Sequence, residues 1–267
     1  MPIRTLKLTL AYDGTNYVGW QRQANGLSVQ EVVESAFVPL MVGARERRNV
    51  AGEHAPAARR GPTVSGAGRT DAGVHALGQV ASVNVDCDLA PSAIQRALNV
   101  RLPADVRVVG VVDAKPGFHA QFHATGKAYR YRIVTTPVVS PFERWFVWHA
   151  PEARDLVSMK AAAAHLVGTH DFASFQASGS AVRDTVRTID RLELVADAAG
   201  ISGDVDGDGF LRHMVRAITG TLVEVGSGVR RPDSMSDVLA ARDRSAAGPT
   251  APASGLTLVS VRYPAVC

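Results

Sequence analysis

Apolar residues stand at every second position near the start of the chain, in the order Leu6, Leu8, Leu10 and Tyr12. This period of two is typical of a half-buried strand. A helix is predicted from about residue 28 to residue 42, because Ser28 and Glu31 have the spacing of a capping box. Apolar residues then recur at helical intervals, at Val29, Val32, Val33, Phe37 and Leu40.

The same kind of pattern continues to the end of the chain. Further strands are predicted at 74–85, 105–113, 127–134, 187–197, 201–206 and 256–263. Further helices are predicted after Pro91, at 152–167 with its end at Gly168, at 210–226 and after Pro232. Two such mixed halves, 1–115 and 116–267, favour an α+β protein. Residues 43–62, with five arginines among Ala, Gly and Pro, are interpreted as a solvated surface loop, and contact with RNA phosphates is a second interpretation.

Composition narrows the class of protein. With 267 residues, 46% of them hydrophobic, the chain can bury one or two ordinary cores. No stretch approaches the roughly 20 apolar residues that span a bilayer, and the start lacks the pattern of a signal peptide. Cys87 and Cys267 form no Cys-x-x-Cys pair. These features predict a cytoplasmic protein that has no membrane segment.

The charge balance points weakly to a polyanionic partner. The net charge is +4 and the pI is about 9.3, and of the 29 basic residues four are lysine and 25 are arginine. The planar guanidinium suits phosphate binding and base stacking better than an ammonium does. Biased codon usage would give the same ratio, so charge alone does not establish RNA binding.

The most distinctive segment, residues 66–73, reads Gly-Ala-Gly-Arg-Thr-Asp-Ala-Gly. Its glycines allow positive φ and close approach of another molecule, and Arg69 favours the ionised form of Asp71. A P-loop is excluded because Val74 follows Gly73, and a dinucleotide fingerprint is excluded because Asp71 stands where Gly or Ala is needed. Asp71 is therefore a candidate nucleophile. Taken alone, an ordinary Asp-Gly turn is the favoured alternative.

No metal site is predicted. Asp204, Asp206, Asp208 and Gly209 match the opening of a calcium loop, but its twelfth position is Val215 in place of glutamate. The histidines lack the Cys/His spacing of a zinc site. His75 follows Asp71 by four residues without the serine or cysteine of a catalytic triad.

Six ordered blocks carry a resemblance to a known family. They lie at 12–23, 66–79, 127–132, 168–175, 209–216 and 251–256, and read YDGTNYVGWQRQ, GAGRTDAGVHALGQ, KAYRYR, GTHDFASF, GFLRHMVR and APASGL. In this order and spacing they resemble the TruA-type tRNA pseudouridine synthases over nearly the whole chain. The resemblance implies that the antiparallel sheets of the two halves join into one central sheet, with the active-site cleft on it.

The resemblance also implies the chemistry and the site. Asp71 would be the nucleophile, Tyr129 would stack on the flipped uracil or act on its C5 proton, and Arg216 would pair with Asp71. Arg212 lies four residues before Arg216, on the same face of the predicted helix. Substrate contacts are expected from Tyr129, Arg69, Arg212 and Leu256. Without the resemblance, Tyr129 and Tyr131 would be interpreted as ordinary strand aromatics, and Tyr131 is expected to pack.

The implied substrate is uridine at positions 38, 39 and 40 of the tRNA anticodon arm, and the implied assembly is a homodimer. The reaction is an isomerisation without redox change, so no cofactor or metal is expected. Two alternatives stay open: a related pseudouridine synthase acting at another RNA position, and a catalytically inactive RNA-binding protein on the same fold.

Overall fold

The structure, a computed structural model, describes residues 3–50, 61–180 and 182–265. The chain divides into two compact units, which are described separately below. The first unit comprises Met1–Ala124 and Ser260–Cys267, and the second unit comprises Thr125–Val259. Strand β10 (Leu256–Arg262) begins among residues of the second unit and ends among residues of the first.

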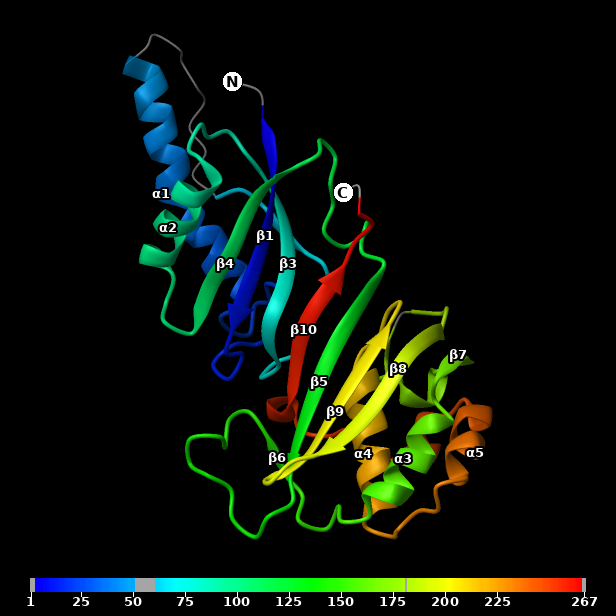
Figure 1. Cartoon of the computed structure of the whole chain (residues 1–267). Helices are drawn as coiled ribbons and strands as arrows, with labels where there is room; N and C mark the ends of the chain where they lie inside the picture. Colours follow the sequence, from blue (N-terminus) through cyan, green and yellow to red (C-terminus); the bar gives the residue numbers. More distant parts are fainter. Residues whose placement is uncertain (1–2, 51–60, 181, 266–267) are drawn as a thin grey trace. The chain divides into compact units, whose positions relative to one another are not determined.

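Strand β1 (Arg4–Tyr12) lies at the centre of the first unit's sheet (Figure 1). It pairs antiparallel with β3 (His75–Val85) on one side and with β4 (Val106–Ala114) on the other. The short strand β2 (Val64–Gly66) pairs antiparallel with β3. The side chains of Leu6, Leu8 and Leu10 are fully buried, as their alternation with less apolar residues predicts.

The helices of the first unit are α1 (Val29–Val50) and α2 (Pro91–Arg101). The two helices contact each other, and α2 packs against β4 (Figure 1). The predicted cap is confirmed, since the backbone N–H of Glu31 donates to the Oγ of Ser28 at 3.2 Å. The predicted end near residue 42 is wrong. The helix continues to Val50 because the segment from Ala44 onward is rich in Ala, Arg and Glu, which are strong helix formers. Residues 51–60 of the predicted loop lie outside the described part.

The second unit also contains a run of paired strands, which belong to the same ten-stranded sheet. Its antiparallel strands follow the spatial order β5, β9, β8, β7, with the bounds Gly126–Val134, Gly200–Gly207, Val186–Ala196 and Gly168–Asp171. The two-residue strand β6 (Trp148–His149) pairs parallel with β5. The sequence patterns located β5, β8 and β9 but not the shorter β2, β6 and β7, which contain too few residues to show a period.

Helices cover one face of these strands (Figure 1). They are α3 (Leu156–Ala164), α4 (Met214–Gly226) and α5 (Ser234–Ala241), and the 3-10 turns are η1 (Ala173–Phe175), η2 (Arg244–Ala246) and η3 (Ala253–Gly255). The predicted helix end at Gly168 is wrong, because α3 stops at Ala164 and Gly168 opens β7 with φ +109°. The predicted helix start at 210 is wrong as well: His213 has φ +63°, which a right-handed helix excludes, and α4 begins after it.

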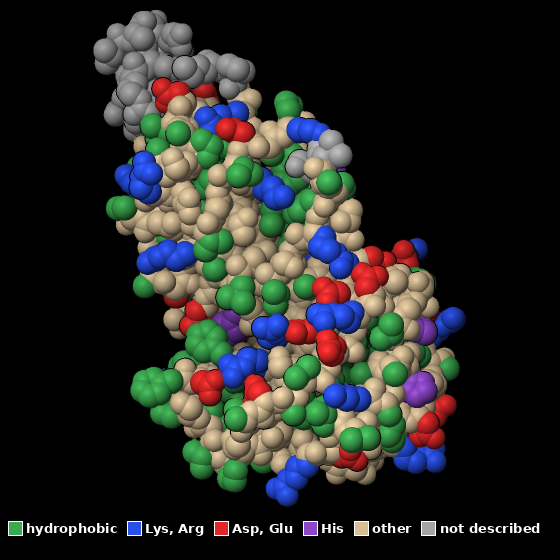
Figure 2. All heavy atoms as spheres, viewed as in Figure 1, with side chains coloured by type: hydrophobic (Ala, Val, Ile, Leu, Met, Phe, Trp, Pro, Cys, Tyr) green, Lys and Arg blue, Asp and Glu red, His purple; other side chains and the backbone are tan. Residues whose placement is uncertain are grey.

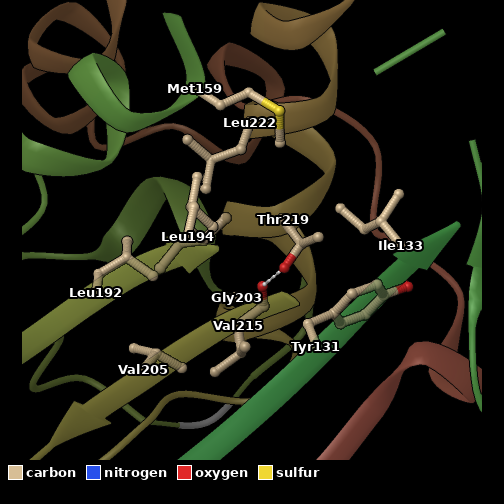
Figure 3. Close-up of a pocket in the computed structure, with 11 residues that line it drawn as sticks. Tyr131, Ile133, Met159, Leu192, Leu194, Gly203, Val205, Val215, Thr219 and Leu222 are labelled. Atoms are coloured by element: carbon tan, nitrogen blue, oxygen red, sulfur yellow. Dashed lines mark hydrogen bonds between the residues drawn. The ribbon is translucent and has the colours of Figure 1, made fainter. Parts of the chain in front are cut away.

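A small cavity lies between α4 and the strands (Figure 3). It has a volume of about 20 Å³ and is lined almost entirely by apolar side chains, among them Leu194, Val205 and Leu222. A cavity of this size without polar partners stays dry. The cavity therefore belongs to the packing of the second unit's core.

The other face of the second unit's strands is charged. Arg130 binds both carboxylate oxygens of Asp204 at 2.7 and 3.0 Å, and Arg191 contacts Asp206 and Glu193 at 3.1 and 2.7 Å. Figure 2 shows this face, with basic and acidic side chains next to each other. Asp204 and Asp206 thus pair with arginines across strands. Both units combine helices with largely antiparallel sheets, so the predicted α+β class is confirmed.

Candidate active site

Asp71 lies on the loop between β2 and β3 in the first unit. Two hydrogen bonds hold the loop against β3. Ala67 N–H donates to Val80 O at 2.7 Å, and the Nε2 of Gln79 donates to Gly68 O at 2.8 Å. A third hydrogen bond, from Val74 N–H to Asp71 O at 3.1 Å, closes the turn. The backbone on both sides of Asp71 is therefore held in place.

A second segment, residues 12–20, runs along this loop and forms hydrogen bonds with it. The backbone N–H of Trp20 donates to Thr70 O at 3.1 Å, and Gly73 N–H donates to Tyr17 O at 3.4 Å. Side chains add to these bonds, since the hydroxyls of Tyr12 and Thr70 lie 2.8 Å apart. The segment belongs to the first of the six sequence blocks, so the structure explains why that block accompanies the aspartate loop.

Two glycines make this close contact possible. Gly19 has φ +106°, and a Cβ there would lie 2.5 Å from the carbonyl oxygen of Thr70. Gly73 has φ +77°, a conformation that residues with a side chain rarely adopt. The two backbones can approach at Gly19 only because this position carries no side chain, and the conformation at Gly73 favours glycine for its positive φ.

The residues next to Asp71 differ in their exposure to solvent. The neighbouring Thr70 is buried, whereas Arg69 is exposed and Asp71 is partly exposed. Among the described residues the Arg69 guanidinium has no ion pair or hydrogen bond. Burial raises the pKa of Tyr12, whose hydroxyl contacts that of Thr70, to about 12. The exposed Arg69 and the partly exposed Asp71 thus stand on a loop whose buried contact residues, Tyr12 and Thr70, carry no charge.

Tyr129 lies on β5 of the second unit. Its side chain is 8% exposed, and its ring meets the ring of Phe210 edge to face at a centroid distance of 5.2 Å. Tyr131, two residues along the same face, packs between α4 and the strands (Figure 3) and donates its hydroxyl hydrogen to Pro252 O at 2.7 Å. Burial raises the pKa of Tyr131 well above its usual range. The prediction that Tyr131 packs is confirmed.

Arg216 is bound to one residue twice. Its Nε donates to Ala251 O at 2.7 Å, and its own carbonyl accepts from Ala251 N–H at 3.1 Å. Arg212 is exposed and precedes α4, so the prediction that it shares a helix face with Arg216 is wrong. Leu256 is buried at the start of β10.

The second unit thus brings several of these residues together. Arg216, Tyr131 and the chain leading to Leu256 all meet at residues 251–252, through the bonds to Ala251 and Pro252. The sequence did not identify Ala251 or Pro252 as anchors, because they bind through backbone carbonyls that any residue type supplies. Asp71 and Arg69 belong to the first unit, and Tyr129, Arg212, Arg216 and Leu256 belong to the second.

Among the described residues, no group of three or more His, Cys, Asp or Glu side chains could hold a metal ion. The described helices also include none with the length and hydrophobicity that a membrane span requires.

The first unit thus carries Asp71 on a loop held by hydrogen bonds, and the second unit carries Tyr129 and Arg216. Comparison with known proteins identifies the class of protein. The family described as tRNA pseudouridine synthase matches residues 9–123 and 162–264. The chain belongs to this family.

Curated relatives match over almost the full length. The tRNA pseudouridine synthase A of Geobacter sulfurreducens is 44% identical over 261 residues, which are 98% of this chain and 100% of that protein. The protein of the same name from Syntrophotalea carbinolica is 45% identical over 97% of this chain and 96% of its own length. A third, from Moorella thermoacetica, is 44% identical over 97% and 99%.

Proposed function

We propose that this protein is an isomerase that converts uridine to pseudouridine at positions 38, 39 and 40 in the anticodon arm of tRNAs, with Asp71 as the nucleophile. The observation that carries the proposal is the braced loop around Asp71, which lies in a chain of the tRNA pseudouridine synthase family. A loop tied down by buried hydrogen bonds holds a reacting group in a fixed place.

The reaction breaks the N1–C1′ bond of the nucleotide and forms a C5–C1′ bond. The C5 proton leaves and N1 gains a proton, so no electrons are gained or lost. The enzyme needs a nucleophile that captures the ring or the sugar, and groups that retain the detached uracil. Asp71 supplies the first, and no redox or metal centre is required.

The other residues take supporting roles in this proposal. Arg216 pairs with Asp71 and keeps it ionised and oriented. Tyr129 faces the uracil and serves the removal of the C5 proton. Arg69, Arg212 and Leu256 contact the substrate; the two arginines are exposed and able to reach RNA phosphates. A nucleotide inside an A-form stem is inaccessible, so the target uridine is flipped out before it reacts.

The proposal includes the cellular compartment and the oligomeric state. The substrate is a cytoplasmic tRNA, and the enzyme works as a homodimer. Two other functions would use the same fold: modification at another RNA position, and RNA binding without catalysis. The presence of Asp71, Tyr129 and Arg216 together disfavours the second.

The test is a map of pseudouridine in tRNA from cells that lack this protein, beside the same cells with the gene restored. We expect loss of pseudouridine at positions 38, 39 and 40 alone, and its return on complementation with the wild-type chain. Loss at other positions would establish the related synthase. An unchanged map, together with tRNA binding by the purified protein, would establish the inactive binding protein.

A further inference from the structure

Lys127 is a half-buried cation on β5, two residues before Tyr129. Its position in the sheet is opposite Gly207 of β9, which in turn pairs with Ile189 of β8. Among the described residues the Lys127 ammonium makes no hydrogen bond and no ion pair. Partial burial of a charge without a partner costs free energy. The position of the Lys127 ammonium is therefore unfavourable unless a group from outside the chain binds it.

A second cation stands close by. Arg187 precedes Ile189 by two residues on β8 and so points to the same face of the sheet. Its side chain passes Gly209, since a Cβ at that glycine would lie 3.6 Å from the arginine Cδ and Nε. Burial, and then the positive charge of Arg187, hold the pKa of Lys127 below its usual range. The two cations thus repel each other.

The acidic groups near these cations do not neutralise them. Asp184 lies 3.9 Å from Arg187 and its side chain is 81% exposed, so this pair is weak. The Oδ1 of Asp208 accepts the backbone N–H of Thr188 at 3.0 Å and thus serves the strand. An anion from outside the chain would satisfy both cations.

The neighbouring side chains indicate where that anion belongs. Lys127 and Tyr129 share a strand face at a spacing of about 7 Å, since each residue advances the strand by about 3.3 Å. The ring of Phe210 borders Tyr129 and also lies against Gly207, where a Cβ would be 3.2 Å from its Cζ. A phosphate bound at Lys127 would therefore lie about 7 Å along the strand from a base bound at Tyr129.

We propose that Lys127 and Arg187 form a binding site for one backbone phosphate of the substrate RNA, next to the nucleotide held at Tyr129. The inference rests on the proposed function, because it takes the nucleotide at Tyr129 to be the target uridine. The site fixes the sugar-phosphate on one side of the flipped nucleotide while the base reacts.

The first test compares Lys127→Met with Lys160→Met. Lys160 is an exposed lysine of α3 in the same unit, so both variants lose one positive charge from that unit. We expect Lys127→Met to bind an unmodified tRNA transcript about tenfold more weakly, the effect of one charge-assisted hydrogen bond. The slope of log affinity against log salt should fall by about one. Lys160→Met should keep the wild-type slope, and Lys127→Arg should restore it.

Thermal melting separates this role from a structural one. Because Met removes an unpaired, partly desolvated charge, Lys127→Met should melt at or above the wild-type temperature while it binds RNA more weakly. Weaker binding that follows a lower melting temperature, with no change in the salt slope, would overturn the proposal. So would a salt slope for Lys127→Met equal to that of Lys160→Met.

The second test removes the charge from the RNA. Anticodon stem-loops are prepared with a single methylphosphonate at each linkage beside the target uridine, on 2′-O-methyl sugars, with the matching phosphate RNAs as controls. One substitution should weaken wild-type binding about tenfold and leave Lys127→Met almost unaffected. Equal losses in both proteins at every linkage would exclude the site. Wild-type enzyme that forms no pseudouridine in intact tRNA would instead contradict the proposed function itself.

Discussion

The hydroxyl group of Tyr12 lies 2.8 Å from that of Thr70, the residue immediately before Asp71. Tyr12 is the last residue of β1, the central strand of the first unit's sheet. A side chain anchored in that strand therefore fixes the backbone next to the proposed nucleophile. The two residues are 58 positions apart in the sequence, so the contact exists only in the folded chain.

The first prediction concerns this bond. Tyr12→Phe removes the hydroxyl and leaves the buried Thr70 Oγ1 without it, which should lower the free energy of unfolding by about 1 kcal/mol. The Asp71 loop loses one restraint, and kcat should fall about tenfold while affinity for tRNA stays near wild type. Single-turnover pseudouridine formation and urea unfolding measure the two effects. Thr70→Val removes the same bond from the other side, so losses in the double variant that equal the sum of the single ones would contradict the coupling.

The second prediction uses the glycine that lies against this loop. Gly19→Ala places a Cβ 2.5 Å from Thr70 O at a positive φ, so it should displace the loop and reduce both melting temperature and activity. Gly117 is the matched control: it also has positive φ, +82°, but nothing lies within 4 Å of its added Cβ. Gly117→Ala should cost only the strain of about 1 to 2 kcal/mol. Equal effects of the two substitutions would show that the close backbone contact is unimportant.

The third prediction concerns Asp71 itself. Asp71→Asn keeps the shape of the side chain and replaces the nucleophilic carboxylate by an amide, so pseudouridine formation should stop while melting temperature and tRNA binding persist. The assay uses enzyme in excess over an unmodified transcript, so that even one slow turnover is seen. An aspartate that only caps a turn would tolerate asparagine with near wild-type activity. Conversion by the folded variant would therefore refute the nucleophile assignment.

The fourth prediction is a dependence of stability on alkaline pH. Burial raises the pKa of Tyr12 to about 12 from the ordinary 10.0, so the unfolded chain loses this proton before the folded chain does. The contribution of the protonated Tyr12 to the free energy of unfolding is complete below about pH 10 and is lost as the pH rises toward 12. The melting temperature of the wild type should fall more steeply over this range than that of Tyr12→Phe. Parallel curves for the two proteins would contradict the assigned pKa.

The fifth prediction is that chelators leave the activity intact, because the isomerisation needs no Lewis acid or redox centre. Exhaustive EDTA treatment followed by assay on prefolded tRNA measures this. Activity that disappears and returns with one particular divalent ion, without a change in tRNA folding, would contradict it.

Several parts of the fold and of the candidate site could be predicted from the sequence because their signals are local. The glycine-rich loop made Asp71 a candidate, whose role stays a prediction. Apolar periodicity located β1, β3 and β5 within a few residues, and Pro91 marked the start of α2. The bond between Tyr12 and Thr70 was not predictable, since either hydroxyl has many possible partners in a chain of this length. The start of α4 was missed because the left-handed conformation of His213 is imposed by its surroundings and not by its residue type. The extension of α1 beyond residue 42 was missed because arginines among small residues suit both a helix and a solvated loop.

Arg216 is held through its Nε, which donates to Ala251 O, and through its carbonyl, which accepts from the same residue. A guanidinium can grip a carboxylate in two ways: sideways, with Nε and one Nη, or end-on, with both Nη atoms. The bond to Ala251 occupies the sideways edge. A carboxylate that forms a bidentate ion pair with Arg216 must therefore approach end-on, along the axis of the arginine side chain. A small shift of the backbone at 251–252 would turn the guanidinium and change the position at which it binds a carboxylate.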